Sequence, residues 1–291
     1  MSGPGAPREE GAGPVPSVAP KRVRLRLDVA YDGTDFSGWA AQPGRRTVAG
    51  VLLTELERLF GDGGATGLTV AGRTDAGVHA SGQVAHVDVV ADRWDKLADD
   101  LVRRLAGLLP PDVRVRAATP VPDTFDARFS ALSRRYVYRV ADTPWGAPPI
   151  RARDTLAWPR HLGVDLMNDA AGRLVGLHNY AAFCRRKENA TTVRSVHRFD
   201  WRRDPDGIVV ATIAADAFCQ SMVRSLVGAL IAVGEGRHPV TWLAELLRRT
   251  ERASDVFVVP PHGLNLVEVA YPTQEHYADR AGETRNRRDL E

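Results

Sequence analysis

Residues 22–33, RVRLRLDVAYDG, alternate between polar and apolar side chains from the first position onward. The apolar positions from Val23 to Tyr31 fall on one side of this pattern, and three arginines and an aspartate fall on the other. A period of two is the spacing of a β-strand, in which successive side chains point to opposite faces. The pattern predicts a strand with one face in a core, so the fold contains a sheet.

Helices and further strands follow along the chain. Strands are predicted at 68–72, 83–90, 113–119, 134–140, 193–201, 207–218 and 263–272. Apolar residues at helical spacing predict one helix between Thr47, as N-cap, and Gly61, and others at 94–109, 162–175, 222–234 and 240–249. Because hairpins and crossovers are mixed, the sequence predicts an α+β fold with helices packed on one face of largely antiparallel sheets.

The two ends of the chain differ from its middle in composition. Residues 1–20 are rich in Gly, Pro and Ala and are expected to form a disordered tail. Residues 275–291 are polar and charged, which predicts a loose C-terminal tail. Between these tails we expect an N-terminal half at 21–145 and a C-terminal half at 146–274.

Composition limits the classes of protein to which the chain can belong. It contains no apolar run of membrane-spanning length, and its N-terminus lacks the apolar segment of a secretory signal. Its net charge of +3 permits a nucleic-acid partner without requiring one. The chain has two cysteines, Cys184 and Cys219, and two do not make the spacing pattern of a disulfide-rich protein. We therefore expect separate buried thiols and a reducing compartment.

Common cofactor motifs are missing. The eight histidines show no metal-ligand spacing, so no metal site is expected. The glycine-rich stretch GDGGATG at 61–67 precedes a predicted strand and matches neither the dinucleotide nor the phosphate-loop pattern. We therefore expect no nucleotide cofactor.

The segment AGRTDAGVHA at 71–80 carries the clearest chemical signal. Turn chemistry alone favours a structural Asp75 that bonds the backbone of the turn. Arg73, however, stands two residues before this carboxylate, where it can keep the carboxylate ionised or bring a phosphate toward it. Such a carboxylate is a credible nucleophile or base for a nucleic acid. For His79 a packing role is favoured.

RRYVYRV at 134–140 carries a second signal. On a strand, Tyr136 and Tyr138 share one face. Aromatic faces stack on extruded bases, but both tyrosines could equally be core residues, and the core is favoured for Tyr138. Residues 185–187, RRK, form a basic cluster that suits either a solvated loop or contact with an RNA backbone.

Together these segments resemble the TruA-type tRNA pseudouridine synthases. The resemblance runs through YDGTDFSGW at 31–39, AGRTDAGVHA at 71–80 and FDARFSALSRRYVYRV at 125–140, and continues through AFCQSMVRSLVGALIAVG at 217–234 and GLNLVEVAYP at 263–272. The segments occur in the order of the family and cover most of residues 22–272.

The resemblance implies a role for five residues. Asp75 matches the catalytic aspartate of the family, and Arg73 matches an arginine that helps to extrude the target base. Tyr136 matches a tyrosine that stacks on the uracil. Arg224 matches an arginine near the catalytic carboxylate, and Leu264 matches a leucine that packs under the target ring.

The resemblance also implies a fold and a reaction. The fold has two α+β halves joined in one extended, mostly antiparallel sheet with helices packed on it and a central cleft. The reaction isomerises uridine to pseudouridine at positions 38, 39 and 40 of the tRNA anticodon stem-loop, without a cofactor. The partner is tRNA, the enzyme is a homodimer, and the location is the cytoplasm.

Two other functions compete with this one. A non-catalytic tRNA-binding module or chaperone would not need a carboxylate at the point of contact with an anionic RNA. A metal-independent nucleoside hydrolase would release free uracil and would need no extended basic surface.

Overall fold

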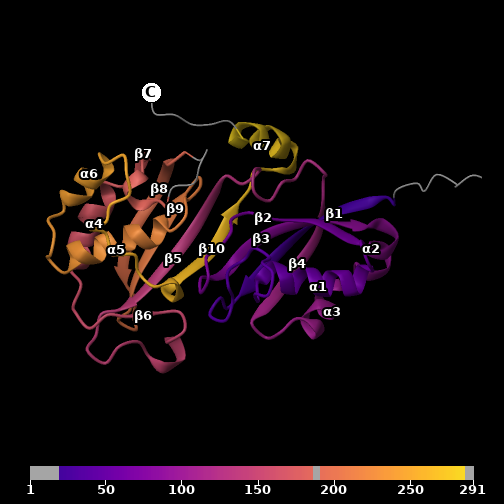
Figure 1. Cartoon of the computed structure of the whole chain (residues 1–291), viewed down its shortest axis with the longest axis horizontal. Coiled ribbons are helices and arrows are strands. Elements are labelled where there is room, and N and C mark those ends of the chain that lie inside the picture. Colours follow the sequence, from indigo (N-terminus) through magenta and orange to yellow (C-terminus); the bar gives the residue numbers. More distant parts are fainter. Residues whose placement is uncertain (1–19, 186–190, 286–291) are drawn as a thin grey trace, which may run out of the picture.

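The computed structural model describes residues 20–185 and 191–285, so most of the tail predicted at 1–20 lies outside the described residues, as do Arg186 and Lys187 of the basic cluster. Within the described ranges the strands form a ten-stranded sheet along the length of the molecule (Figure 1). The strands are β1 (Arg22–Tyr31), β2 (Ala65–Val70), β3 (His79–Val90), β4 (Val113–Val121), β5 (Ser133–Ala141), β6 (Leu156–Ala157), β7 (Gly176–Asn179), β8 (Val193–Arg203), β9 (Val209–Ala215) and β10 (Leu264–Ala270).

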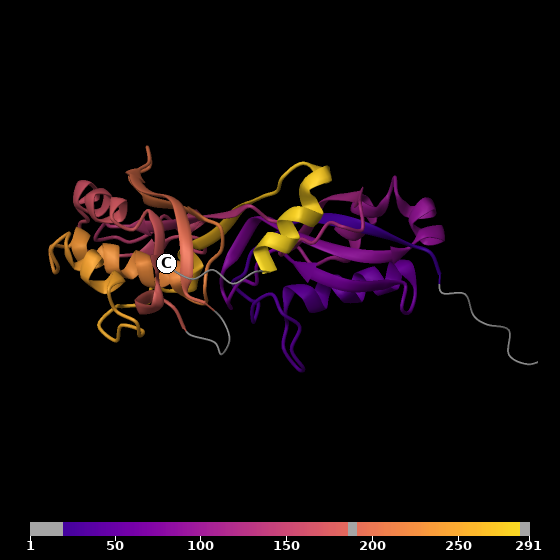
Figure 2. The same ribbon diagram turned by 90° about the horizontal axis from the view of Figure 1, so that it is seen from above.

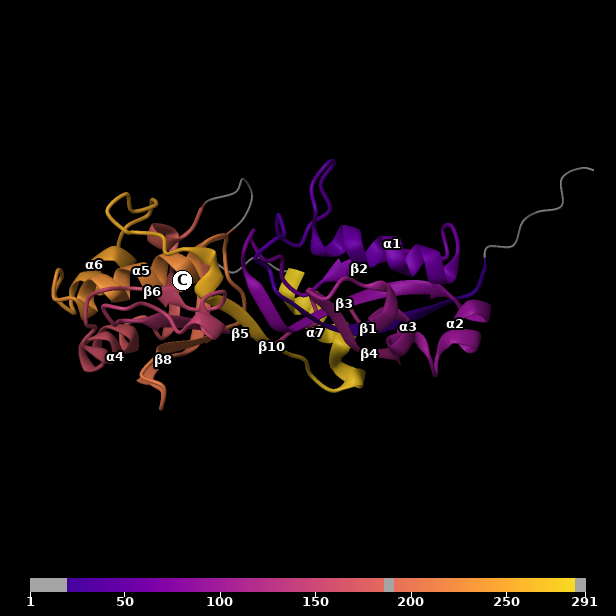
Figure 3. The same ribbon diagram turned by 90° about the horizontal axis from the view of Figure 1, so that it is seen from below.

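The main path of the sheet runs β4-β1-β3-β10-β5-β9-β8-β7, with β2 paired to β3 and β6 paired to β5. Most pairs are antiparallel, and β10 with β3 and β5 with β6 are parallel. Strands from the two parts of the chain occupy opposite ends of the molecule and meet at β10 and β5 (Figures 2 and 3). The predicted α+β class with one extended, mostly antiparallel sheet is confirmed.

The helices are α1 (Val48–Phe60), α2 (Ala91–Leu97), α3 (Leu101–Leu108), α4 (Val164–Gly172), α5 (Met222–Gly234), α6 (Trp242–Leu247) and α7 (Tyr277–Arg285). As predicted, Thr47 caps α1, because its hydroxyl accepts a hydrogen bond from Gly50 N at 3.2 Å. Gly61 ends the helix with a φ of +85°. The α5 helix is buried along almost its whole length and packs against α4.

Two predictions about helices are wrong. The segment 94–109 is not one helix, because α2 ends at Leu97 and α3 begins after Asp100. Two aspartates fall at this break, and aspartate disfavours helix interiors because it competes for backbone hydrogen bonds. The C-terminal segment is not a loose tail as far as residue 285, because α7 docks by burying Tyr277 and Ala281.

Candidate active site

Asp75 lies in the turn between β2 and β3, and this turn is braced from one side by the loop at 33–39. Trp39 N donates to the carbonyl of Thr74 at 3.1 Å, and a Cβ on Gly38 would lie 2.9 Å from that same oxygen. Gly77 has a φ of +77°, and a Cβ there would approach the Pro261 side chain to 2.8 Å. The glycines therefore serve close packing of the turn, while the Asp75 side chain stays 36% exposed.

A buried polar network holds the turn from the other side. Tyr31 Oη lies 2.7 Å from Thr74 Oγ1, and Gln83 Nε2 donates to Tyr31 Oη at 3.2 Å and to the carbonyl of Gly72 at 2.9 Å. Gln83 is fully buried, and burial raises the pKa of Tyr31 to about 12, although its hydrogen bonds with Thr74 and Gln83 act in the opposite direction. The hydroxyl therefore stays protonated and fixes the residue directly before Asp75.

Sequence analysis assigned no role to Thr74, Tyr31 or Gln83. One signal was present, because Gln83 opens a segment, 83–90, that was predicted to be a strand and is mostly apolar. A buried amide needs hydrogen-bond partners, but the sequence does not say which groups supply them. The partners come from β1 and from the turn, which only the folded arrangement brings together.

His79 begins β3 and joins the turn to neighbouring segments. Its Nδ1 lies 3.0 Å from Gly33 N and 3.1 Å from a carboxylate oxygen of Asp32, and its Nε2 lies 2.8 Å from the carbonyl oxygen of Arg153. The ring is buried, in line with the packing role favoured for it. Since its polar contacts are to Gly33, Asp32 and Arg153, His79 supports the turn structurally.

Arg224 reaches Asp75 from the opposite half of the chain. It lies in the first turn of α5, where Nε donates to the carbonyl of Val259 at 2.7 Å and Nη1 lies 3.8 Å from the Asp75 carboxylate. The guanidinium is only 19% exposed. The bond to Val259 fixes the guanidinium next to the carboxylate, so that the two opposite charges attract each other across the cleft.

Tyr136 and Leu264 are brought to the same place by the order of the strands. The parallel pairing of β10 with β3 sets Asn265 opposite His79, so Leu264 lies level with the end of the turn that carries Asp75. Tyr136 is on the neighbouring strand β5 and packs edge-on against Phe218, with ring centroids 5.3 Å apart. Burial raises the pKa of the Tyr136 hydroxyl far above its usual range, so the ring is neutral.

All five residues singled out from the sequence line one cleft of about 1050 Å³. The turn between β2 and β3 contributes Arg73 and Asp75 to its walls. Strands β5 and β10 contribute Tyr136 and Leu264, and helix α5 contributes Arg224. Arg73 is exposed and makes no ion pair within the described part of the chain. The cleft is therefore large enough for an extruded nucleotide, and these five residues contribute one carboxylate, two arginines and two apolar faces to its lining.

A buried arginine connects three backbone segments that line this cleft. Arg134 is 7% exposed and donates to the carbonyls of Ala71, Arg128 and Asp216 at 2.8, 2.6 and 2.6 Å. Burial lowers its pKa from the usual value. The guanidinium thereby connects the start of the turn that carries Asp75 with the loop after β9, across the two halves. Sequence analysis did not identify Arg134 as a functional residue.

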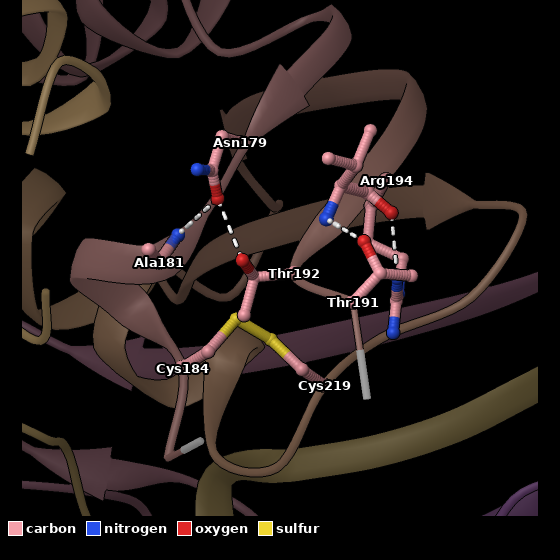
Figure 4. The surroundings of a disulfide bond; sticks show 8 residues. Asn179, Ala181, Cys184, Thr191, Thr192, Arg194 and Cys219 are labelled. Carbon is pink, nitrogen blue, oxygen red and sulfur yellow. Dashed lines mark hydrogen bonds between the residues drawn. A yellow bond between two sulfur atoms is a disulfide. The ribbon is translucent and has the colours of Figure 1, made fainter. Parts of the chain in front are cut away.

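The two cysteines contradict the prediction of separate thiols. Cys184 and Cys219 form a disulfide, with Cα atoms 5.6 Å apart (Figure 4). The bridge joins the segment after Phe183 to the loop that leads into α5, and Arg185 N donates to the carbonyl of Gln220 beside it. Sequence spacing could not reveal this pair, because its two members meet only when β8 and β9 have formed. The inference of a reducing compartment from unpaired cysteines is therefore unsupported.

The described residues were also considered as ligands of a metal ion and as parts of a membrane-spanning helix. No group of three or more His, Cys, Asp or Glu side chains within them could hold a metal ion. No helix among them has the length and apolarity to cross a membrane.

Comparison with known proteins identifies what the chain resembles. A family model described as tRNA pseudouridine synthase matches residues 29–130 and 170–272. A protein of Frankia casuarinae named tRNA pseudouridine synthase A is 58% identical over 263 residues, covering 90% of this chain and 94% of the relative. Proteins of the same name from Streptomyces griseus and Mycobacterium leprae are 52% and 48% identical, covering 93% and 91% of this chain and 96% of each relative. The ranges matched by the family model include Arg73, Asp75, Arg224 and Leu264 but not Arg134 or Tyr136.

Proposed function

The chain belongs to the tRNA pseudouridine synthase family and isomerises uridine to pseudouridine in tRNA, and we propose that its targets are positions 38, 39 and 40 of the anticodon stem-loop. We further propose Asp75 as the residue that acts on the nucleoside. The observation that carries this proposal is the position of its carboxylate in the cleft, beside Arg224 and level with Leu264.

The substrate uridine must leave the stem-loop before the cleft can hold it. Unstacking and unpairing a base costs on the order of a few kcal/mol. Arg73 is exposed on the turn and is free of carboxylate partners among the described residues, so it is available to the phosphates flanking the extruded nucleotide. Tyr136 and Leu264 then provide faces for the two sides of the uracil ring, and the neutral phenol adds no charge next to the base.

Asp75 then either attacks C1′ of the ribose as a nucleophile or removes a proton from the sugar to give a glycal. Cleavage of the glycosidic bond builds positive charge at C1′, which a nearby carboxylate stabilises. Arg224 places a positive charge 3.8 Å from that carboxylate and holds it in the cleft by electrostatic attraction. The detached uracil rotates between Tyr136 and Leu264, and its C5 bonds to C1′ as the bond to Asp75 breaks or, on the glycal route, as Asp75 returns the proton to the sugar. The C5 proton is then lost and N1 gains one, so that one carboxylate suffices.

The Asp75→Asn variant tests this assignment, since it keeps the shape of the side chain and removes its charge. Wild type should form pseudouridine at positions 38–40 of unmodified tRNA, and the variant should be slower by at least about 10³-fold with unchanged tRNA affinity. Equal activity of the two proteins would refute the role of Asp75. Binding of tRNA without pseudouridine from wild type would favour the non-catalytic module, and release of free uracil would favour the hydrolase.

We also propose that the enzyme works as a homodimer in the cytoplasm. Both statements are adopted from the resemblance to the TruA-type enzymes, in which one tRNA contacts two subunits. Light scattering of the purified protein with and without tRNA tests the first, because a monomeric mass in the active complex would exclude it.

A further inference from the structure

Helix α7 lies beyond the part of the chain that the family model matches, which ends at residue 272. It is nevertheless docked firmly beside the N-terminal strands, above them in Figure 1 and across them in Figure 2. The Tyr277 ring lies 4.9 Å from that of Phe125, and the buried Ser130 hydroxyl donates to the carbonyl of Tyr277 at 3.1 Å. These contacts account for the docking of the helix through its first turn.

The rest of α7 carries two arginines, and Arg280 also contributes to docking, since its side chain is only 15% exposed and its Nε donates to the carbonyl of Ala131 at 3.4 Å. Arg280 and Thr284 line the same cleft as Asp75, so the helix forms part of the cleft wall. Arg285, one turn further, places its guanidinium 4.9 Å from the centre of the Phe129 ring, which also lines the cleft. Cationic side chains of α7 therefore extend the wall of the site that surrounds Asp75.

Arg128 adds a third cation to this rim. Its guanidinium also lies 4.9 Å from the centre of the Phe129 ring, and no carboxylate pairs with it in the described residues. Arg280 pairs with Glu283 at 3.1 Å, and Arg285 lies 3.7 Å from Asp126 with 57% of its side chain exposed. Each pair has one exposed partner, Glu283 at 67% and Arg285 at 57%, and solvent screens such pairs to about 0–1 kcal/mol, so a phosphate can replace the carboxylate at little cost.

The chemistry of this rim suits the sugar–phosphate backbone of RNA. Guanidinium groups match the oxygens of a phosphate with two parallel hydrogen bonds, and contacts to the backbone position a nucleic acid without reading its sequence. Arginines held over an aromatic ring are also pre-ordered, which reduces the entropy lost on binding. A purely structural strap would account for Tyr277, Ala281 and the bond from Arg280 to Ala131, but not for the guanidinium groups of Arg128 and Arg285 beside Phe129.

We propose that α7, together with Arg128, forms an RNA-backbone clamp at the rim of the cleft. It grips the substrate beside the nucleotide that enters the site, through Arg280 and Arg285. This inference rests on the proposed function, because it takes tRNA as the occupant of the cleft. Helix α7, which lies outside the region matched by the family model, thus contributes to the affinity for tRNA and takes no part in the chemistry.

The double variant Arg280→Ala, Arg285→Ala tests the clamp. Each phosphate contact changes the slope of log K against log salt by about 0.7–0.9, so two lost contacts should weaken tRNA binding by about 15- to 30-fold at 0.15 M salt. The KM for tRNA should rise in proportion, and kcat at saturating tRNA should stay the same. Arg103→Ala is the matched control, because Arg103 pairs with Asp100 three residues away on α3, far from the cleft.

A second variant separates charge from packing. Arg280→Lys with Arg285→Lys keeps both charges and should recover the wild-type salt slope. A double alanine variant that lowers the melting temperature but leaves the salt slope equal to that of Arg103→Ala would reduce α7 to a structural strap and overturn the proposal. Since the slope is measured by binding alone, it decides the clamp even if wild type forms no pseudouridine, a result that would instead refute the proposed function.

Discussion

Replacing Tyr31 by phenylalanine tests how far catalysis depends on the network behind the catalytic turn. The Tyr31 hydroxyl lies 2.7 Å from Thr74 Oγ1 and accepts from Gln83 Nε2, so its loss removes two buried contacts at once. The ring is 5% exposed, and phenylalanine fills the same space. The variant therefore isolates the hydroxyl from the packing around it.

The loss of this hydroxyl has a cost in stability. A buried polar group left without a partner costs about 1–3 kcal/mol, and Thr74 loses its side-chain partner while Gln83 keeps its bond to Gly72. We expect the free energy of unfolding to fall by about 2 kcal/mol, which lowers the melting temperature by roughly 4–8 °C for a protein of this size.

The loss of activity should exceed what the loss of stability explains. Thr74 precedes Asp75, and a misplacement of about 1 Å in a catalytic group can reduce the rate by about 10²-fold. In single-turnover assays with saturating tRNA, we expect the rate of Tyr31→Phe to fall by at least about ten-fold, with tRNA affinity unchanged.

Tyr180→Phe is the matched control for this experiment. Its hydroxyl is equally buried and donates to the carbonyl of Leu174 at 2.6 Å, in the C-terminal half near α4. It should lose a similar amount of stability and keep its rate. If Tyr31→Phe loses no more activity than Tyr180→Phe, then the network does not position the catalytic turn and our reasoning fails.

Two further predictions concern stability. Because the disulfide closes a loop of 35 residues, Cys219→Ser should lower the free energy of unfolding by about 4 kcal/mol, and a dithiol reductant should reproduce this loss in wild type and leave the variant unaffected. Burial raises the pKa of the Asp142 carboxyl, but hydrogen bonds from Arg203 and the backbone of Leu162 outweigh this effect and leave the pKa below its usual value. As the pH falls, Asp142 is therefore protonated in the unfolded state before it is protonated in the folded state, and the stability that it contributes is lost. The urea midpoint of wild type should exceed that of Asp142→Asn by the largest amount at neutral pH. The difference between the two midpoints should shrink as the pH falls through the pKa of Asp142 in the folded state.

The elements of the fold that follow from local pattern could be predicted from the sequence. The alternation in β1 places Leu25, Leu27 and Val29 in the core, and the Thr47 hydroxyl caps α1. These features depend on neighbours within a few residues, so the sequence contains all that determines them. The prediction of a single helix at 94–109 was wrong, because the apolar spacing continues through the break between α2 and α3. Two aspartates at this break favour the interruption.

The polar contacts of the site could not be predicted in the same way. The sequence indicated that Asp75 is unusual, but it did not show that Tyr31 and Gln83 hold the turn or that Arg134 binds three carbonyls beneath it. Polar side chains have several possible partners, and the choice is made by which strands become neighbours. The polar composition of 277–285 likewise concealed a docking helix, because its two buried residues, Tyr277 and Ala281, are too few to form a clear periodic signal.

The short parallel contact between β3 and β10 explains why segments far apart in the chain converge on one cleft. Parallel strands begin at the same edge of a sheet, so the turn before β3 and Leu264 at the start of β10 become neighbours once His79 pairs with Asn265. The Asn265 side chain reinforces this register by accepting from Ser81 N at 2.9 Å. A slip of one residue would turn Leu264 to the other face of the sheet, away from the carboxylate. The register of this one pair thus places the apolar floor of the site beneath Asp75.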